Sequence, residues 1–178
     1  PEVVEYAREC GGAPQSTVLV YGDKVPAAMA AFANGPMARA LDMGDVHDEG
    51  EHTSEYIVPV LFALAEMRGG ATGKELLTSY CVGGEVQGRI GNACRGLSGI
   101  EKYKKKVNYN QWGSICAGAK LLGFDLDTAW NAIGIGYSVL GSSDWQSTAE
   151  GNLVKRFQHA FTCADAIHCL ALARRGIT

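Results

Sequence analysis

The sequence contains one helix-length run that is almost entirely apolar, Ile57-Val-Pro-Val-Leu-Phe-Ala-Leu-Ala-Glu66. Thr53 or Ser54 can cap the start of this helix, and Gly69 with Gly70 can end it. A helix that is apolar on nearly all of its faces must be surrounded by other elements. The run therefore predicts a central helix around which the rest of the chain packs.

Further helical segments lie on both sides of this run. Because proline favours the first turn of a helix, we expect a helix over residues 27–33 to end at Asn34-Gly35 and a separate short helix to begin at Pro36. The other predicted helices cover residues 3–10, 74–90, 113–122, a segment capped by Asp125 or Asp127, and 153–175.

Small residues dominate the predicted helix faces. Gly83, Gly84 and Gly88 stand inside one helix, where each glycine costs about 1 kcal/mol against alanine. Close approach of a neighbouring helix is the usual compensation. Strand patterns are nearly absent, apart from a short hairpin or extended arm at residues 16–26. The sequence therefore predicts an all-α fold, a compact multi-helix array with small-residue helix packing.

The bulk composition indicates one soluble domain. The 178 residues are 47% hydrophobic, so we expect residues 1–178 to form a single helical domain. A net charge of -3 with mixed signs gives no broad basic face for nucleic acid. No apolar run approaches the roughly 20 residues that span a bilayer, and the N-terminus lacks the basic start of a signal peptide. We expect a cytoplasmic protein that binds neither nucleic acid nor membrane.

The cysteines form no Cys-x-x-Cys pair and are spread through alanine-rich helical segments. This distribution predicts reduced, buried thiols rather than disulfides or metal ligands. The residues are Cys10, Cys81, Cys94, Cys116, Cys163 and Cys169.

The segment from Ala40 to Ser54 is rich in titratable groups, and carboxylates beside imidazoles can supply a general acid and a general base. We expect Asp42, which follows an apolar helix, to be less exposed than Asp48, Glu49 and Glu51. We expect His52 to lie beside the free N–H groups of the next helix. The alternative is a solvated loop in which Asp42 is a structural acceptor. The titratable residues are Asp42, Asp45, His47, Asp48, Glu49, Glu51 and His52.

A metal site is a second alternative for this segment. His47 and His52 with nearby carboxylates could bind a metal and serve a metal-dependent enzyme. Their spacing matches no strong zinc signature, and the segment offers no thiolate. We therefore predict no metal site.

A second group of candidate residues opens the last predicted helix. Lys155 and Arg156 follow two apolar residues, so one of them can point inward and hold a carboxylate or phosphate. A surface pair of cations is the alternative. His159 follows Lys155 by four residues and shares its helix face. We expect His168 to be a satisfied core histidine.

A third candidate is the stretch from Asn108 to Gly113, which contains two further polar residues and two aromatics. It could line a pocket for a small polar ligand, or it could be a capped loop packed on the core.

Several motifs, in this order, resemble the MmgE/PrpD family, which includes 2-methylcitrate dehydratase, cis-aconitate decarboxylase and iminodisuccinate epimerase. The resemblance extends over nearly the whole chain. The motifs are Ala33-Asn-Gly, Ala40-Leu-Asp42, His52-x-Ser followed by Ile57 to Glu66, Gly73-Lys-Glu-Leu-Leu77, Gly118-Ala-Lys-Leu-Leu-Gly123 and Glu150-Gly-x-x-Val-Lys-Arg156.

The resemblance implies a fold and an activity. It implies a helical domain that is part of a longer chain with a separate lid domain, and it implies a homodimer. Pro1 without a methionine and Thr178 after a glycine typical of a helix end agree with a fragment. The implied activity is that of a lyase or isomerase on a small di- or tricarboxylate, by elimination, decarboxylation or epimerisation, without metal or organic cofactor.

The resemblance also assigns roles to residues. Its aspartate, histidine and lysine fall on Asp42, His52 and Lys155, which we expect to be catalytic. Lys155 and His52 would hold substrate carboxylates, while Asp42 or a histidine moves the proton. The residues expected to contact the substrate are Asp45, Arg156 and His159.

The chain departs from the family pattern at four places near these residues, so no named substrate is assigned. A non-catalytic helical module for oligomerisation is the alternative from another class of protein. The departures are Met43-Gly44-Asp45, Val46, Lys106 to Tyr109, and Gln158-His159.

Overall fold

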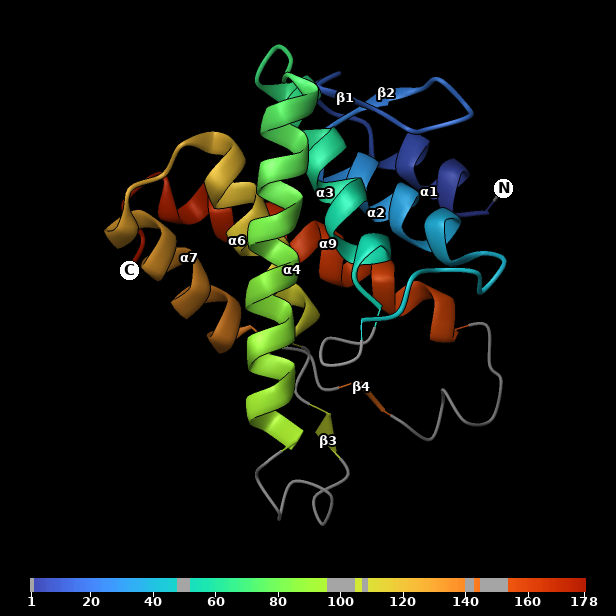
Figure 1. Ribbon diagram of the computed structural model, residues 1–178. Coiled ribbons are helices and arrows are strands. Elements are labelled where there is room, and N and C mark those ends of the chain that lie inside the picture. Colours follow the sequence, from blue (N-terminus) through green and yellow to red (C-terminus); the bar gives the residue numbers. More distant parts are fainter. Residues whose placement is uncertain (1, 48–51, 96–104, 107–108, 140–142, 145–153) are drawn as a thin grey trace.

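The computed structural model describes residues 2–47, 52–95, 105–106, 109–139, 143–144 and 154–178, and it is built mainly of helices (Figure 1). The all-α prediction is confirmed. The helices are α1 Glu2–Cys10, α2 Ala27–Arg39, α3 Ser54–Met67, α4 Gly73–Arg95, α6 Asn110–Leu122, α7 Leu126–Ser138 and α9 Val154–Ala173.

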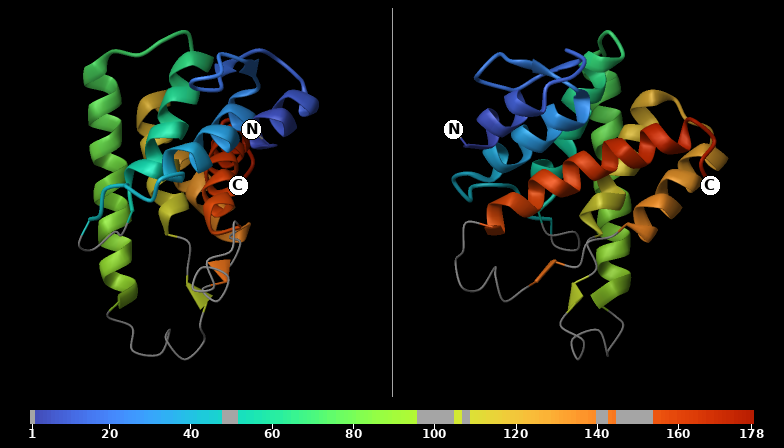
Figure 2. Two further views of the ribbon diagram at one scale, coloured as in Figure 1. Left: turned by 90° about the vertical axis from the view of Figure 1, so that its right-hand side faces the viewer. Right: turned by 180° about the vertical axis from the view of Figure 1, so that it is seen from behind.

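The apolar helix α3 lies at the centre of the array, as its sequence predicts. It packs against α2, α4, α6 and α9, and its side chains Ile57, Val60 and Leu64 are at most 1% exposed. Complete burial of one such side chain contributes about 1.5 to 3 kcal/mol. Helix α9 runs across the back of the molecule beside α2 (Figure 2). Residues far apart in the sequence therefore meet where α2, α3 and α9 converge.

Glycines allow the close helix contacts that the sequence predicts. A Cβ atom at Gly83 of α4 would lie 2.6 Å from the carbonyl oxygen of Gly113 and 2.8 Å from the Cβ of Ala117, both in α6. A Cβ at Gly118 would collide with Leu170 of α9. Helix α6 therefore approaches both neighbours too closely for a larger residue at these positions.

Helix α2 differs from its prediction, because it continues through Pro36 to Arg39 as one helix. Pro36 removes one helical hydrogen bond, but packing on α9 holds the segment in place. A Cβ at Gly35 would lie 2.9 Å from the carbonyl oxygen of His159 and 3.1 Å from the Sγ of Cys163. The continuous helix brings Arg39 to its last turn, directly before the loop that carries Asp42.

Two predictions about buried side chains are corrected. His168 is exposed, because it falls on the outer face of α9 between the buried Ile167 and Cys169. All six cysteines are free thiols, but only Cys163 and Cys169 are buried, whereas Cys10 and Cys81 are exposed. The helical period of each segment, rather than its alanine content, decides which side a side chain faces.

Short antiparallel strands complete the described structure. Strands β1 (Ser16–Thr17) and β2 (Lys24–Val25) form the predicted hairpin, with Ser16 opposite Val25. The hairpin is fixed to the central helix because the Ser16 hydroxyl donates to the carbonyl oxygen of Ala63 at 2.6 Å. The other two strands, β3 (Lys105–Lys106) and β4 (Ser143–Asp144), pair antiparallel.

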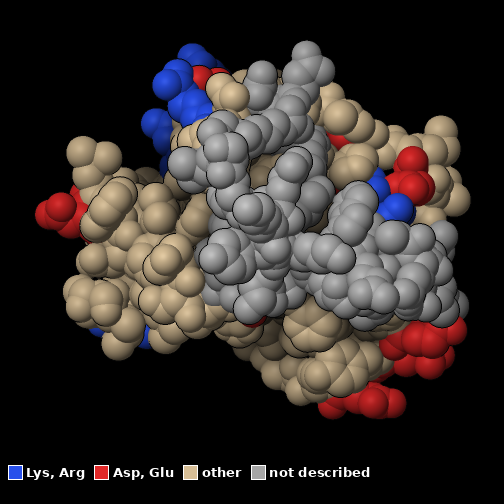
Figure 3. Space-filling view, turned by 90° about the horizontal axis from the view of Figure 1, so that it is seen from below, with Lys and Arg blue, Asp and Glu red and all other residues tan. Residues whose placement is uncertain are grey.

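The described surface agrees with the composition. Among the described residues on the face seen from below, Lys and Arg side chains lie in separate groups, and some of these lie beside Asp or Glu side chains (Figure 3). Among the helices that the structure describes, none has the length and apolar character needed to cross a membrane.

Candidate active site

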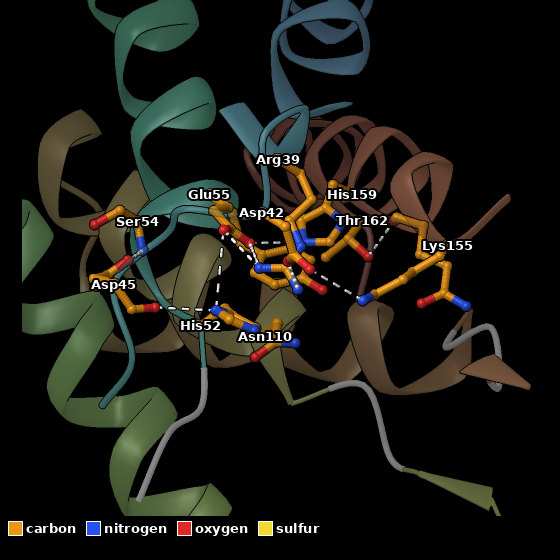
Figure 4. A network of polar contacts seen from close by, with 12 residues as sticks. Arg39, Asp42, Asp45, His52, Ser54, Glu55, Asn110, Lys155, His159 and Thr162 are labelled. Atoms are coloured by element: carbon orange, nitrogen blue, oxygen red, sulfur yellow. Dashed lines mark hydrogen bonds and ion pairs between the residues drawn. The ribbon is translucent and has the colours of Figure 1, made fainter. Parts of the chain in front are cut away.

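Polar side chains meet where the end of α2, the start of α3 and the first turns of α9 converge (Figure 4). Arg39 comes from α2, Glu55 from α3, and Lys155 and His159 from α9. Asp42 and His52 come from the loop between α2 and α3. All three predicted catalytic residues therefore belong to one group.

Arg39 and Glu55 form a buried ion pair at the base of this group. The Arg39 Nη1 atom donates to both Glu55 carboxylate oxygens, at 2.8 Å and 3.1 Å, and the two side chains are only 6% and 2% exposed. Burial alone raises the pKa of the Glu55 carboxyl, but hydrogen bonds from His159 and Arg39 and the charge of Arg39 leave that pKa below its usual value. Glu55 is therefore ionised at neutral pH.

His159 is the third buried member of the group. Its Nε2 atom lies 3.1 Å from Glu55 Oε2, and its ring stacks on Tyr56 with 4.2 Å between centroids. The His159 side chain is 5% exposed. The sequence predicts His159 as a substrate contact. In this structure the His159 ring is instead buried against Glu55 and Tyr56.

Asp42 lies between two cations. Its Oδ1 atom is 2.6 Å from Arg39 Nη2, and its Oδ2 atom is 3.4 Å from Lys155 Nζ. The charge of Arg39, supported by Lys155 and His52, lowers the pKa of Asp42 below its usual value. The Asp42 side chain is 54% exposed. Its burial relative to Asp48, Glu49 and Glu51 stays a prediction, since those three residues lie outside the described structure.

Lys155 points toward Asp42 and is accessible to solvent. Its side chain is 32% exposed, and its ion pair with Asp42 is long for a charged contact. A small anion can therefore approach its ammonium group. Arg156 lies in the same turn of α9, but its side chain is outside the described part of the structure.

His52 and Asp45 are joined at the start of α3. The Nδ1 atom of His52 lies 3.0 Å from the Asp45 carbonyl oxygen and 3.9 Å from Glu55 Oε1. Asp45 Oδ1 accepts from the backbone N–H of Ser54 at 2.9 Å, and Oδ2 accepts from the Tyr80 hydroxyl at 3.2 Å. Asp45 thus satisfies the first turn of α3, the position where His52 was expected. Both carboxylate oxygens of Asp45 have protein donors.

His47 belongs to the alternative hypothesis of a metal site. The ring of His47 packs against α4, within 3.0 Å of where a Cβ at Gly88 would lie. In the described residues, which omit 48–51, no group of three or more His, Cys, Asp or Glu could hold a metal ion.

The segment that opens α6 packs on neighbouring helices. Gln87 Nε2 donates to Asn110 Oδ1 at 2.7 Å and to the His52 carbonyl oxygen at 2.6 Å. Gln111 is 1% exposed. These contacts favour the packed loop over the ligand pocket. The hydrogen bond from Gln87 also holds the backbone of His52 in place. Asn108 lies outside the described residues.

Arg39 and Glu55 were not recognised as site residues from the sequence. A glutamate in the first turn of a helix and an arginine in the last turn are ordinary helix-end residues, so neither residue attracted attention. Gly44 carries the one usable signal, because a Cβ at this position would overlap with Glu55 Oε1. A glycine two residues after Asp42 marks a place where another group approaches the loop.

Comparison with known proteins gives a consistent result. Residues 2–178 match the family model of the MmgE/PrpD N-terminal domain. The chain is 29% identical over 168 residues to the cis-aconitate decarboxylase-like protein oryM of Aspergillus oryzae, covering 90% of this chain and 34% of that protein. It is 29% identical over 165 residues to cis-aconitate decarboxylase of Aspergillus terreus, covering 89% and 33%. It is 31% identical over 146 residues to the mouse cis-aconitate decarboxylase, covering 79% and 30%. The chain thus spans about one third of the length of these relatives.

Proposed function

The chain belongs to the MmgE/PrpD family, and on that basis we propose that it contributes Asp42, His52 and Lys155 to the active site of a lyase or isomerase. The substrate is a small di- or tricarboxylate. The reaction is an elimination, decarboxylation or epimerisation by acid and base catalysis.

The observation that carries the proposal is the position of Lys155 next to Asp42, with His52 close by. The lysine ammonium and the histidine ring lie at the rim of a group whose base is the buried Arg39 and Glu55 pair. The reactions named above pass through carbanion-like transition states, in which negative charge develops beside a carboxylate. Fixed positive groups stabilise that charge.

Each side chain has a defined task in this mechanism. Lys155 binds one substrate carboxylate, which takes over the place of Asp42 beside the ammonium. His52 binds a second carboxylate or a developing enolate oxygen. In an elimination, the ionised Asp42 accepts the proton from carbon, and a protonated histidine gives a proton to the departing hydroxyl, which leaves as water. In an epimerisation, Asp42 accepts the proton and a protonated histidine returns one to the opposite face of the same carbon. In a decarboxylation, the carbon–carbon bond breaks, the electron pair stays on the substrate, and a protonated histidine returns a proton to that carbon.

The relatives suggest the first substrate to test. Several of them are named cis-aconitate decarboxylases, and the candidate site offers Lys155 and His52 as separate groups for the carboxylates of such a substrate. Val46 and Gln158-His159 depart from the family pattern close to the candidate residues, so citrate, 2-methylcitrate and iminodisuccinate belong in the same panel. The homodimer, the cytoplasmic location and the independence of metals and cofactors stay predictions.

The test is turnover of this panel by the full-length protein and its variants. We expect Lys155→Ala, His52→Ala and Asp42→Asn each to lower kcat/KM by about 100-fold, because each removes a charge-stabilising or proton-transfer group. Lys120→Ala, which removes an exposed lysine of α6, is the matched control. The proposal is wrong if all three site variants turn over the panel as well as the parent does.

A further inference from the structure

We propose that Glu55 is a positioning residue of the proposed active site. It fixes Arg39 so that Asp42 faces Lys155, and it determines which tautomer the neutral form of the His159 ring adopts, the one protonated at Nε2. The catalytic consequence of this inference depends on the proposed function, whereas its structural part does not.

The Glu55 carboxylate is buried, and its charge is compensated by neighbouring side chains. It is 2% exposed and contacts Arg39 and His159. A buried charge is stable only when nearby groups compensate it. Among the described residues around it, the Arg39 guanidinium supplies a positive charge, and the rings of His159 and His52 place nitrogen atoms 3.1 Å and 3.9 Å from its carboxylate oxygens.

Glu55 divides the donors of Arg39 between two carboxylates. Nη1 is directed at Glu55 and Nη2 at Asp42. Because the guanidinium group is planar, fixing one of these nitrogens fixes the other. Without Glu55, Asp42 could take both nitrogens in the stronger two-bond arrangement. The carboxylate of Asp42 would then move away from Lys155.

Glu55 also decides which nitrogen of His159 carries hydrogen. An ionised carboxylate can only accept, so the contact of 3.1 Å requires the hydrogen on His159 Nε2. In the neutral ring Nδ1 is then an acceptor. Neither Nδ1 of His159 nor Nε of Arg39 has a hydrogen-bond partner among the described residues, although both atoms are buried. The tautomer of His159 therefore depends on Glu55.

Two glycines leave room for this arrangement. A side chain at Gly44 would overlap with Glu55 Oε1, and a side chain at Gly35 would press on the backbone of His159. The loop after α2 can therefore lie directly over the Glu55 carboxylate only because residue 44 has no Cβ.

Nitrogen NMR of histidine tests the tautomer without any substrate. In the full-length protein labelled with 15N-histidine, at a pH where the ring is neutral, we expect a protonated Nε2 and an unprotonated Nδ1 for His159. The signals are assigned by their loss in His159→Asn. A proton on Nδ1 in the unmodified protein would overturn the inference, and this measurement requires no change at Glu55.

The variant Glu55→Gln sharpens the test. A glutamine places its carbonyl oxygen toward Arg39 and its NH2 toward His159, so we expect the neutral ring to switch to the Nδ1–H tautomer. Glu55→Asp keeps a carboxylate and should keep the Nε2–H tautomer. Glu66→Gln is the control, because Glu66 lies on the same helix but accepts a hydrogen bond from Thr17. This variant should leave the tautomer of His159 unchanged. An unchanged tautomer in folded Glu55→Gln contradicts the inference.

Kinetics separate positioning from mere stability. In Glu55→Gln we expect kcat for the best panel substrate to fall about tenfold or more while KM changes less than about threefold, because the reacting base moves but Lys155 still binds the substrate. If Glu55→Gln lowers activity only by reducing the amount of folded protein, and kcat per folded molecule stays normal, the positioning role of Glu55 is wrong. If the parent turns over no polycarboxylate, the proposed function fails while the NMR result still decides the role of Glu55 toward His159.

Discussion

Glu55 carries a charge although its side chain is buried. Its carboxylate accepts from Arg39 and lies within hydrogen-bond distance of His159, residues that belong to two other helices. Removing one partner of a buried ion pair leaves an uncompensated charge and costs about 3 to 5 kcal/mol. Asp42, by contrast, is half exposed, and solvent screens its contacts with Arg39 and Lys155. Glu55 should therefore matter for stability and Asp42 mainly for chemistry.

Acid should reveal the contribution of Glu55. The folded-state pKa of Glu55 lies below its usual value of 4.5, so below that value the unfolded chain takes up a proton that the folded protein does not. This contribution is fully present above about pH 4.5 and is lost as the pH falls through the lower folded-state pKa. We expect the free energy of unfolding, measured in urea from pH 7 to pH 3, to fall less steeply in Glu55→Gln than in the parent. Glu85→Gln, an exposed change on α4, should keep the steep fall, and equal slopes for all three proteins would refute the expectation.

Helices in this molecule are placed by their small residues as much as by their large ones. The contact of α4 with α6 requires Gly83, and the contact of α2 with α9 requires Gly35. Helix α2 continues through Pro36 beside this contact, so that Arg39 reaches the site. A helical glycine that lies away from neighbouring helices does not serve close helix packing in this way. A Cβ at Gly134 of α7 would meet no atom within 4 Å.

Two glycine substitutions should therefore have opposite effects. Gly83→Ala forces a Cβ against the backbone oxygen of Gly113, and overpacking of this kind costs about 1 to 3 kcal/mol. Gly134→Ala fits without contact and should stabilise the protein by about 0.5 to 1 kcal/mol, since it restricts the unfolded chain. Thermal unfolding followed by circular dichroism measures both. Destabilisation by Gly134→Ala, or none by Gly83→Ala, would show that the helix spacing is not what the structure describes.

At the scale of the whole molecule, the site is assembled from three segments that are separated in the sequence. The convergence of α2, α3 and α9 brings Asp42 within 3.4 Å of Lys155, 113 residues later. A ligand that bridges these segments binds only to the folded state. It must therefore raise the stability of the whole fold.

A polycarboxylate should consequently raise the melting temperature of the protein. At a concentration of about 100 times Kd, one bound ligand stabilises the fold by about 2.7 kcal/mol. We expect cis-aconitate or a related tricarboxylate to shift the melting temperature of the parent by several degrees, and to shift that of Lys155→Ala far less. A monocarboxylate at equal ionic strength is the control. If no polycarboxylate produces a shift, the protein is better explained as a helical packing module.

Local signals in the sequence were enough to predict the order of the helical segments and the family. The glycine pair at residues 69–70 ends α3 and Asp125 caps α7, since both signals act within a few residues. The apolar run of α3 predicted its own central position, and the motifs around Asp42, His52 and Lys155 made these residues the predicted catalytic group. What such local signals could not predict is which polar residues meet. Arg39 and Glu55 are 16 residues apart, and Glu55 and His159 are 104 apart. The continuous α2 and the outward His168 were missed for the same reason, because helix packing outweighs the preference of a single proline and decides which face of α9 is covered. The packing of the helices brings the buried Glu55 carboxylate to the same guanidinium group as Asp42, and this arrangement depends on how three helices cross.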